Sequence, residues 1–200
     1  MLRRSGKSAF MPDAFVFPGG TVDEADRAAG LPSGWSASRV AEEFRSATSS
    51  ELPPDQPAIS PEDAQALIHA AARELREEAD ITVDPAELRL FSHWITPSGE
   101  PRRYNTFFFV AHAPHGQHGR ADAFETHDAR WISPAAALDA AARGEMLIRY
   151  PTLKHLERLA AFSATNALLA YARSKPIVTI MPGGMPEEGF ALPAALEGHW

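Results

Sequence analysis

Three glutamates lie close enough in the sequence to act together on a cation. Glu77 and Glu78 follow Glu74 by three and four positions, a spacing that places all three side chains on one face of a helix. Carboxylates gathered in this way repel one another, and a bound divalent cation relieves the repulsion, since magnesium prefers oxygen ligands. The alternative interpretation is a solvated acidic helix end that Arg73 and Arg76 partly neutralise.

The helix that carries these glutamates is predicted from its start signals and its periodicity. Ser60 is a favourable N-cap, Pro61 suits the first helical position, and Asp63 stands where a capping-box acid would be. Apolar residues then recur at helical spacing as far as Ala79, namely Ala64, Leu67, Ile68, Ala71, Ala72 and Leu75. Because this stripe lies on the adjacent face, we expect the carboxylates to border the core.

The remaining elements are predicted from shorter apolar runs. Strands are expected at residues 15–17, 81–83, 88–94, 104–111, 129–132 and 177–181. Helices are expected at residues 38–45, 135–143 and 151–172, the last as one long amphipathic helix. Together they predict a mixed α+β domain with helices packed on a sheet.

The first strand ends in a Pro-Gly-Gly turn that precedes the glutamates by about fifty residues. The turn at residues 17–20 and the run at residues 73–81 together resemble the Nudix box, Gly-x5-Glu-x7-Arg-Glu-U-x-Glu-Glu-x-Gly-U. Gly20 is the opening glycine, and Asp26 falls where the first glutamate should be. The second half is matched by Arg73, Glu74, Leu75, Glu77, Glu78 and Ile81.

The box departs from the family pattern in two places. Gly20 and Arg73 are 53 positions apart where the motif requires 14, so the box carries 39 extra residues. We place this insertion at about residues 27–60. Asp80 replaces the last glycine, at a position where the chain usually leaves the helix in a left-handed conformation that Asp tolerates better than most residues.

Segments beyond the box resemble a Nudix branch with a long insertion, a branch that includes coenzyme A diphosphatases. They lie at residues 92–97, 103–108, 125–131 and 150–152. The resemblance implies the Nudix α/β/α sandwich with a mixed sheet, an insertion after the first Pro-Gly-Gly turn and an added C-terminal helical extension at about residues 151–173. It covers the whole chain, so we expect a single domain over residues 1–200.

The resemblance also implies metal-dependent hydrolysis of a diphosphate linkage in a nucleoside diphosphate derivative, with Mg²⁺ or Mn²⁺ as cofactor. The expected metal ligands are Glu74, Glu77 and Glu78, and the expected catalytic residues are Glu77, Glu78 and Glu125. The expected substrate-binding residues are Arg4, Arg103 and Tyr104. The expected loop-supporting residues are Gly19, Gly20, Asp26 and Arg73, with Arg73 paired to Asp26 or to a helix glutamate.

The coenzyme A signature of the family is only partly present. Aligned on the Pro-Gly-Gly turn, the chain keeps Arg4 and Ser5 of the signature but has Ala9 for its second arginine and Asp13 for its glycine. Losing an arginine removes a phosphate contact, and the added aspartate repels a phosphorylated substrate. The candidate substrates are therefore coenzyme A or acyl-coenzyme A, together with NADH, ADP-ribose and diadenosine polyphosphates.

Composition narrows the classes of function. The 200 residues contain no cysteine, which excludes disulfide scaffolds and thiolate metal sites. A net charge of −7 argues against nucleic-acid binding through a basic face. Without a leader, an address signal or a membrane span, we expect a cytoplasmic protein whose partner is a small-molecule diphosphate substrate and not a membrane.

Two further expectations concern assembly and activity. Residues 1–5 resemble the middle of a family strand, so the chain is expected to start late, and an uncovered strand edge would favour a homodimer.

A second class of function also stays open, a Nudix-fold nucleotide-binding or regulatory module with weak catalysis. Asp80 and the insertion favour the module, whereas the intact glutamate set favours the enzyme, because recognition alone does not require a costly carboxylate cluster.

Overall fold

The computed structural model describes residues 1–7, 12–45, 59–97, 99–100, 102–122, 126–183, 190–196 and 200. These residues fall into two compact units. The first comprises Met1–Val22, Ala70–Asp84 and His112–Leu168, and the second comprises Asp23–His69, Pro85–Ala111 and Leu169–Trp200. The single domain expected over residues 1–200 stays a prediction. In the described chain, no helix combines the length and the apolar character needed to cross a membrane.

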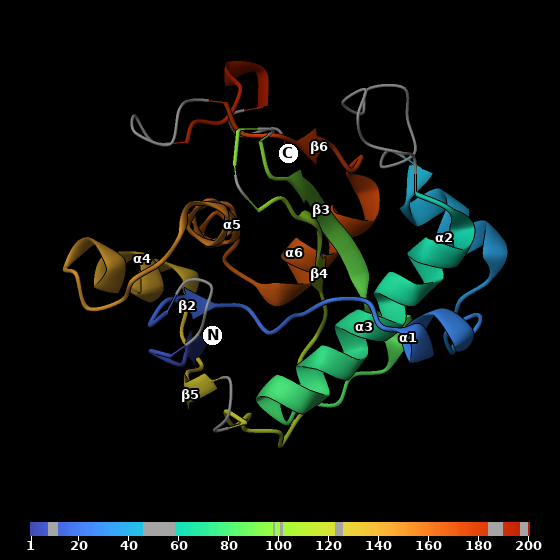
Figure 1. Ribbon diagram of the computed structural model, residues 1–200, viewed down its shortest axis with the longest axis horizontal. Helices are drawn as coiled ribbons and strands as arrows, with labels where there is room; N and C mark the ends of the chain where they lie inside the picture. The colour runs from blue at the N-terminus through green and yellow to red at the C-terminus, as the bar shows by residue number, and fades with distance from the viewer. Residues whose placement is uncertain are drawn as a thin grey trace. The chain divides into compact units, whose positions relative to one another are not determined.

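Strands and helices follow one another in short groups along the chain (Figure 1). The helices are α1 (Glu24–Ala28), α2 (Ala37–Glu43), α3 (Pro61–Ala79), α4 (Pro134–Ala142), α5 (Tyr150–Ala160) and α6 (Thr165–Ser174), with short 3₁₀ turns η2 (Pro85–Glu87) and η3 (Ala194–Leu196). The strands are β1 (Leu2–Arg4), β2 (Phe15–Val16), β3 (Arg89–Ile95), β4 (Asn105–Val110), β5 (Thr126–Ala129) and β6 (Thr179–Ile180).

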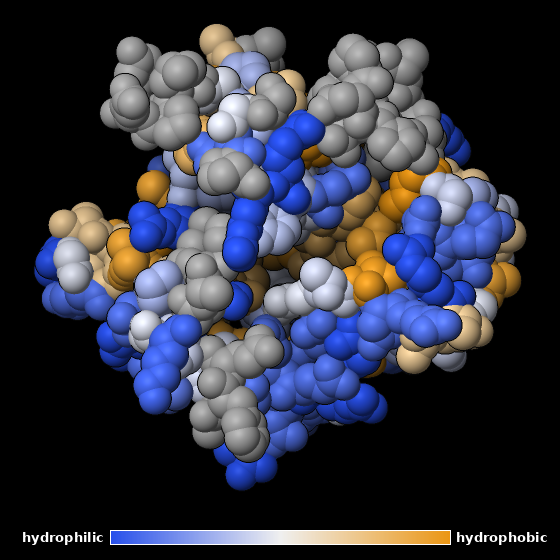
Figure 2. All heavy atoms as spheres, viewed as in Figure 1, coloured by the Kyte–Doolittle hydropathy of each residue, from blue (hydrophilic) through white to orange (hydrophobic). Residues whose placement is uncertain are grey.

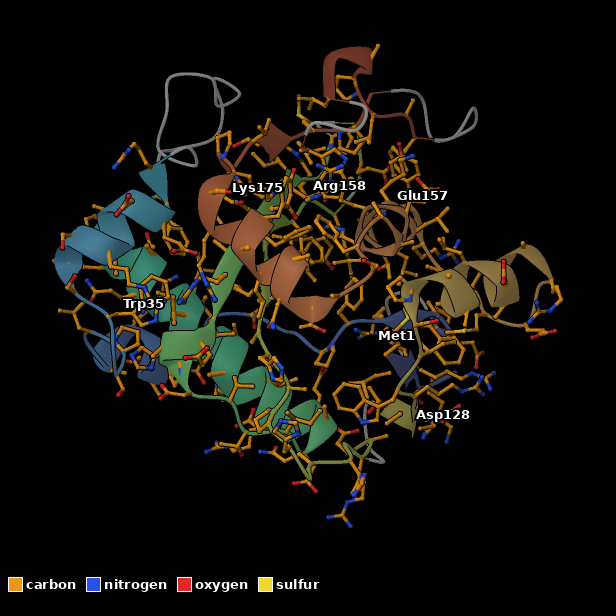
Figure 3. The ribbon with its side chains drawn as sticks, turned by 180° about the vertical axis from the view of Figure 1, so that it is seen from behind. Met1, Trp35, Asp128, Glu157, Arg158 and Lys175 are labelled. Atoms are coloured by element: carbon orange, nitrogen blue, oxygen red, sulfur yellow. The ribbon has the colours of Figure 1, made fainter. Side chains whose placement is uncertain are left out.

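The first unit contains an antiparallel sheet in the order β2-β1-β5. Leu2 in the central strand pairs with Val16 on one side and with Ala129 on the other. Helices α4 and α5 lie side by side in this unit (Figure 1). A small core forms where Phe15 packs with Ala140 and Met146. Met1 lies near the β5 residue Asp128, seen from behind in Figure 3, and its ammonium group donates to the Arg130 carbonyl at 2.8 Å.

The second unit contains a sheet in the order β4-β3-β6. β3 is antiparallel to β4 and parallel to β6, so this sheet is mixed, as the sequence predicts. Phe44 at the end of α2 packs near the rings of Phe107 and Phe109 in β4, with centroids 5.9 and 6.2 Å away. Lys175, labelled in Figure 3, places its ammonium group 4.4 Å from the ring centroid of Phe91.

Helix α3 has the predicted bounds and the predicted cap. The Ser60 hydroxyl accepts the Asp63 amide and donates to the Asp63 carboxylate, each at 3.0 Å. Both contacts satisfy groups at the helix start that would otherwise lack intrahelical partners. Near the other end of the helix, Glu78 is only 8% exposed, whereas Glu77 is exposed. The glutamates therefore do border the buried face, but to different degrees.

Two predicted strands differ from the structure. Residues 81–83 form no strand, because both the amide and the carbonyl of Thr82 bond to the side chain of Gln117 at 2.7 and 3.0 Å. The strand expected at residues 129–132 begins and ends earlier, as β5. Its pairing with β1 fixes this position, since Arg4 pairs with Thr126 and Leu2 with Ala129.

The helix expected over residues 151–172 is also wrong as a single element. It is two helices, α5 and α6, with residues 161–164 between them. The amides of Ala161 and Phe162 bond to the carbonyls of Arg158 and Leu159, three residues back, which tightens and ends α5. The helical extension expected at about residues 151–173 is thus present as a pair. The insertion expected at about residues 27–60 contains α2, and its residues 46–58 lie outside the described residues.

A buried histidine joins all three strands of the mixed sheet. His93 in β3 is 1% exposed and stacks on Phe107 with a centroid distance of 4.1 Å. Its Nε2 bonds to the Asn105 side-chain oxygen, and its Nδ1 accepts from the Thr179 hydroxyl at 2.8 Å. Burial lowers the pKa of His93 below 6.5, and the Asn105 hydrogen bond opposes this only in part.

This burial predicts a stability that falls with acidification. Because the folded pKa lies below 6.5, the unfolded chain binds more protons between the two pKa values, so the stability is complete above pH ~6.5 and falls as the pH drops to the folded pKa. His93→Gln should lower the unfolding midpoint at pH 7.5 and flatten its dependence between pH 7 and 5. Thermal unfolding across this range checks it, with exposed His112→Gln as control. Equal slopes in wild type and His93→Gln would contradict the assignment.

Candidate functional site

In the first unit, the Pro-Gly-Gly loop lies against the last turns of α3. The Gly19 amide donates to Glu78 Oε2 at 2.8 Å, across 59 positions of sequence. A backbone amide that donates to a carboxylate makes a charge-assisted hydrogen bond, which is stronger than a bond between neutral groups. Loop and helix are thereby joined at the residue that the sequence identifies as a metal ligand.

Arg73 makes the second connection between loop and helix. Its Nη1 donates to Glu74 at 2.9 Å and to Glu77 at 3.0 Å, and its Nη2 donates to the Thr21 carbonyl at 3.0 Å. The Arg73 and Glu74 side chains are 20% and 14% exposed, so their attraction is less screened than that of a surface pair. One guanidinium group thus offsets part of the charge of two neighbouring carboxylates and holds the loop that precedes them.

Gly20 shows how closely the loop approaches the helix. A Cβ atom at this position would lie 2.2 Å from Glu74 Oε1, whereas a Cβ atom at Gly19 would meet nothing within 4 Å. Since the overlap involves the end of a flexible side chain, a larger residue at position 20 would displace the Glu74 carboxylate rather than the backbone. Because Gly20 has no side chain, the Glu74 carboxylate can lie next to the loop and bond to Arg73.

The helix ends as the family pattern leads us to expect. Asp80 has a φ of 54°, the left-handed conformation for which the family uses glycine. This backbone turn lets the amides of Asp80 and Ile81 bond to the carbonyls of Arg76 and Leu75 at 3.1 and 3.3 Å. The replacement of glycine by aspartate thus leaves the helix end intact.

The structure brings together six of the predicted site residues in the first unit: Gly19, Gly20, Arg73, Glu74, Glu77 and Glu78. Arg4, also in this unit, ends β1, and its amide donates to the Ala14 carbonyl at 2.9 Å. Glu125 lies outside the described residues. Its predicted role stays a prediction.

The other three predicted residues belong to the second unit. Asp26 is buried at the start of α1, where its carboxylate accepts the Asp23 amide at 3.0 Å in a capping box. Arg103 and Tyr104 close the turn before β4. Arg103 Nε donates to the Thr96 carbonyl, and the Tyr104 amide donates to the Thr96 hydroxyl, both at 3.0 Å. These contacts give each residue a structural role, and their predicted functional roles stay predictions.

The glutamates suit a divalent cation by their chemistry. Arg73 Nη1 lies between the carboxylates of Glu74 and Glu77, where it stands in for a cation. Within the part of the chain that the structure describes, no group of three or more histidine, aspartate and glutamate side chains is gathered closely enough to hold a metal ion. The three glutamates thus supply the oxygen donors that a divalent cation prefers, but here they are not gathered around one point, and Glu74 and Glu77 share the Arg73 guanidinium instead.

The surface over the C-terminal half of α3 is largely hydrophilic in Figure 2, as a site for a charged ligand requires. Sequence reasoning did not find the Thr21 carbonyl or the side chains of Gln117 and Arg120, which bond to the residues around the end of the helix. A backbone acceptor has no sequence signal. Asp80 in place of glycine was a signal for a cationic partner such as Arg120, because an added charge at a helix end tends to be paired.

The contacts of Arg73 predict its contribution to stability. Arg73→Ala leaves Glu74 and Glu77 to repel each other and removes the bond to Thr21, so it should lower the free energy of unfolding by about 1–3 kcal/mol. The matched control is Arg76→Ala, whose side chain is 62% exposed and lies 3.6 Å from Glu77, and which should cost less than about 0.5 kcal/mol. Urea denaturation at pH 7 measures both. Equal losses would show that Arg73 is an ordinary surface charge.

Comparisons with known proteins agree with this geometry. Residues 56–153 match the NUDIX domain family. The match begins at residue 56, near the end of the insertion, so it includes α3 and its glutamates but not the Pro-Gly-Gly loop. The crystal structure of a NUDIX hydrolase from Alicyclobacillus acidocaldarius is similar, with a TM-score of 0.62 and 20% identity over 88% of this chain and 87% of that one. This likeness confirms the predicted fold.

A curated relative is "Putative nudix hydrolase 7" of Caenorhabditis elegans, which is 25% identical over 194 residues. The alignment covers 91% of this chain, and the chain spans only 62% of that relative's length. The family and the names of these relatives support the prediction of a hydrolase, whereas nothing in them names coenzyme A. The domain match, the fold and the curated relative therefore agree: the chain is similar to proteins of the Nudix domain family, and the match to the family model extends over residues 56–153.

Proposed function

We propose that the protein hydrolyses a diphosphate linkage in a nucleoside diphosphate derivative and requires a divalent metal ion. The observation that carries this proposal is the joining of the Gly-Gly loop to the acidic end of α3 through Arg73 and the Gly19 amide. Diphosphate hydrolysis requires that charge on two phosphoryl groups be neutralised and that a water molecule be positioned for in-line attack. A helix end with three carboxylates and one arginine suits this task.

Glu74, Glu77 and Glu78 would hold Mg²⁺ or Mn²⁺. When bound there, the ion would supply positive charge to the phosphoryl oxygens and acidify a water molecule. Glu77 and Glu78 are the catalytic candidates of this group, with Glu125 as a further one. Substitution of Glu77, Glu78 and Glu125 one at a time identifies the residue that accepts the proton from water.

The chain's own residues prepare this site. Arg73 keeps Glu74 and Glu77 beside each other at 2.9 and 3.0 Å from a single nitrogen, so part of their repulsion is offset before any ligand binds. The Gly19 amide fixes one oxygen of Glu78. Positioning of this kind lowers the reorganisation that the reaction itself would otherwise need.

Among substrates, coenzyme A or an acyl derivative is our preferred candidate. The signature glycine of the coenzyme A branch corresponds to Asp13, which has a φ of 59° and so adopts the conformation that glycine would. Its carboxylate pairs with Arg3 at 2.9 Å, which reduces the repulsion that an unpaired aspartate would exert on a phosphorylated ligand. These observations support the alignment to that branch, with Arg4 beside this pair as the substrate-binding candidate.

A substrate panel tests the proposed function. Coenzyme A, NADH, ADP-ribose and diadenosine polyphosphates are incubated with the protein and Mn²⁺ or Mg²⁺, and products are separated by chromatography. We expect cleavage of coenzyme A to 3′,5′-ADP and 4′-phosphopantetheine. Turnover of ADP-ribose far above that of coenzyme A would overturn the preferred substrate. Binding without turnover of any member would favour the regulatory module over the enzyme.

Glu78→Gln tests the site independently of the choice of substrate. The variant removes a charge without creating a cavity, and its amide oxygen can still accept the Gly19 amide. We therefore expect normal folding, an unfolding midpoint equal to or slightly above that of the wild type without metal, and loss of nearly all hydrolysis. Wild-type turnover by Glu78→Gln at saturating Mg²⁺ would show that the reaction takes place elsewhere.

Assembly and location complete the proposal. In the structure β1 pairs with β2 on one side and β5 on the other, so the uncovered edge expected at the N-terminal strand is absent there, and the homodimer stays a proposal that light scattering measures directly. The cytoplasmic location rests on the sequence.

A further inference from the structure

A segment of the long loop before β5 is tied to the end of α3. We name residues 117–120 the strap. The Arg120 amide donates to the Ala79 carbonyl at 2.7 Å, and the Gln117 side chain bonds to both backbone groups of Thr82. The Arg120 guanidinium donates to one oxygen of Asp80 from Nε at 3.1 Å and from Nη2 at 2.7 Å.

The strap also approaches closely at its glycine. Gly119 has a φ of 62°, and a Cβ atom there would lie 3.1 Å from Ile81 Cδ1 and 3.4 Å from the Ala79 carbonyl oxygen. The next residue back, His118, accepts a hydrogen bond from Trp131 Nε1 through its carbonyl at 2.6 Å. The strap is therefore held on one side by Trp131 and on the other by the residues that follow the helix.

The place of these contacts matters because Glu77 and Glu78 lie in the last turn of α3. The last turn of a helix has carbonyls without intrahelical partners and frays readily. Asp80 adds to this tendency, since an aspartate adopts the left-handed conformation less freely than the glycine of the family pattern. Two carboxylates that must act together are thus placed where a helix is least ordered, unless something outside the helix holds its end.

We propose that Gln117 and Arg120 are positioning residues that keep Glu77 and Glu78 in helical register, with Arg120 compensating for Asp80 in place of glycine. The inference deepens the proposed function and depends on it for its catalytic part. The structural part stands on the contacts alone. Neither side chain needs to touch substrate for this role.

Amide hydrogen exchange tests the structural part without any substrate. The reporters are the amides of Asp80 and Ile81, which bond to Arg76 and Leu75. Because the Arg120 and Asp80 side chains are 82% and 60% exposed, Arg120→Ala should exchange about twofold to fivefold faster at these amides, and Arg120→Ala/Gln117→Ala should exchange faster still. Asp80→Gly/Arg120→Ala should return towards the wild-type rate, because glycine adopts this conformation freely. The matched control is Arg143→Ala, which removes an exposed pair of similar length, 2.7 Å to Glu145.

Steady-state kinetics on the substrate found by the panel tests the catalytic part. Arg120→Ala should lower kcat, with KM changed less than about twofold, and Arg120→Lys should recover part of the loss. Unchanged exchange in Arg120→Ala/Gln117→Ala, or faster exchange with unchanged kcat, overturns the proposal. An equal loss of kcat in Arg143→Ala does so as well. If the wild type hydrolyses nothing, the proposed function fails, and exchange alone decides whether the strap holds the helix end.

Discussion

One guanidinium group between two carboxylates and a loop carbonyl is the interaction on which the site depends. Arg73 offsets the repulsion between Glu74 and Glu77 and holds Thr21 in the loop, while the Gly19 amide engages Glu78. Without this compensation, a helix end with three neighbouring glutamates would be pushed apart by its own charges. The proposed divalent cation would offset the same repulsion that Arg73 offsets here.

The contact between loop and helix survives a long insertion because chain length costs little. Lengthening the connection from the 14 positions of the family motif to 53 adds only about 1 kcal/mol of loop-closure entropy. The change at position 80 is of another kind, since it alters the backbone preference at the end of α3. At this position Asp80 adopts the left-handed conformation, and its carboxylate accepts a hydrogen bond from the Arg120 guanidinium.

The sequence predicted those parts that local signals determine. The bounds of α3, its Ser60 cap and the left-handed Asp80 each follow from residue types at fixed spacings. What it could not predict depends on partners distant in sequence: the Thr21 carbonyl bonded to Arg73, and the Gln117 side chain that takes the place of a strand partner for Thr82. The break between α5 and α6 was missed because the apolar periodicity continues through it. The role of Glu125 stays a prediction.

The central claim is that the acidic end of α3 is where a divalent cation binds. Calorimetric titration of Mn²⁺ into the wild type and into Glu74→Gln/Glu77→Gln tests it most directly, with Glu62→Gln in the first turn of the same helix as control. We expect saturable binding by the wild type and by Glu62→Gln, and loss of that binding in the double variant. Mn²⁺ binding by the double variant with wild-type affinity and stoichiometry would contradict it.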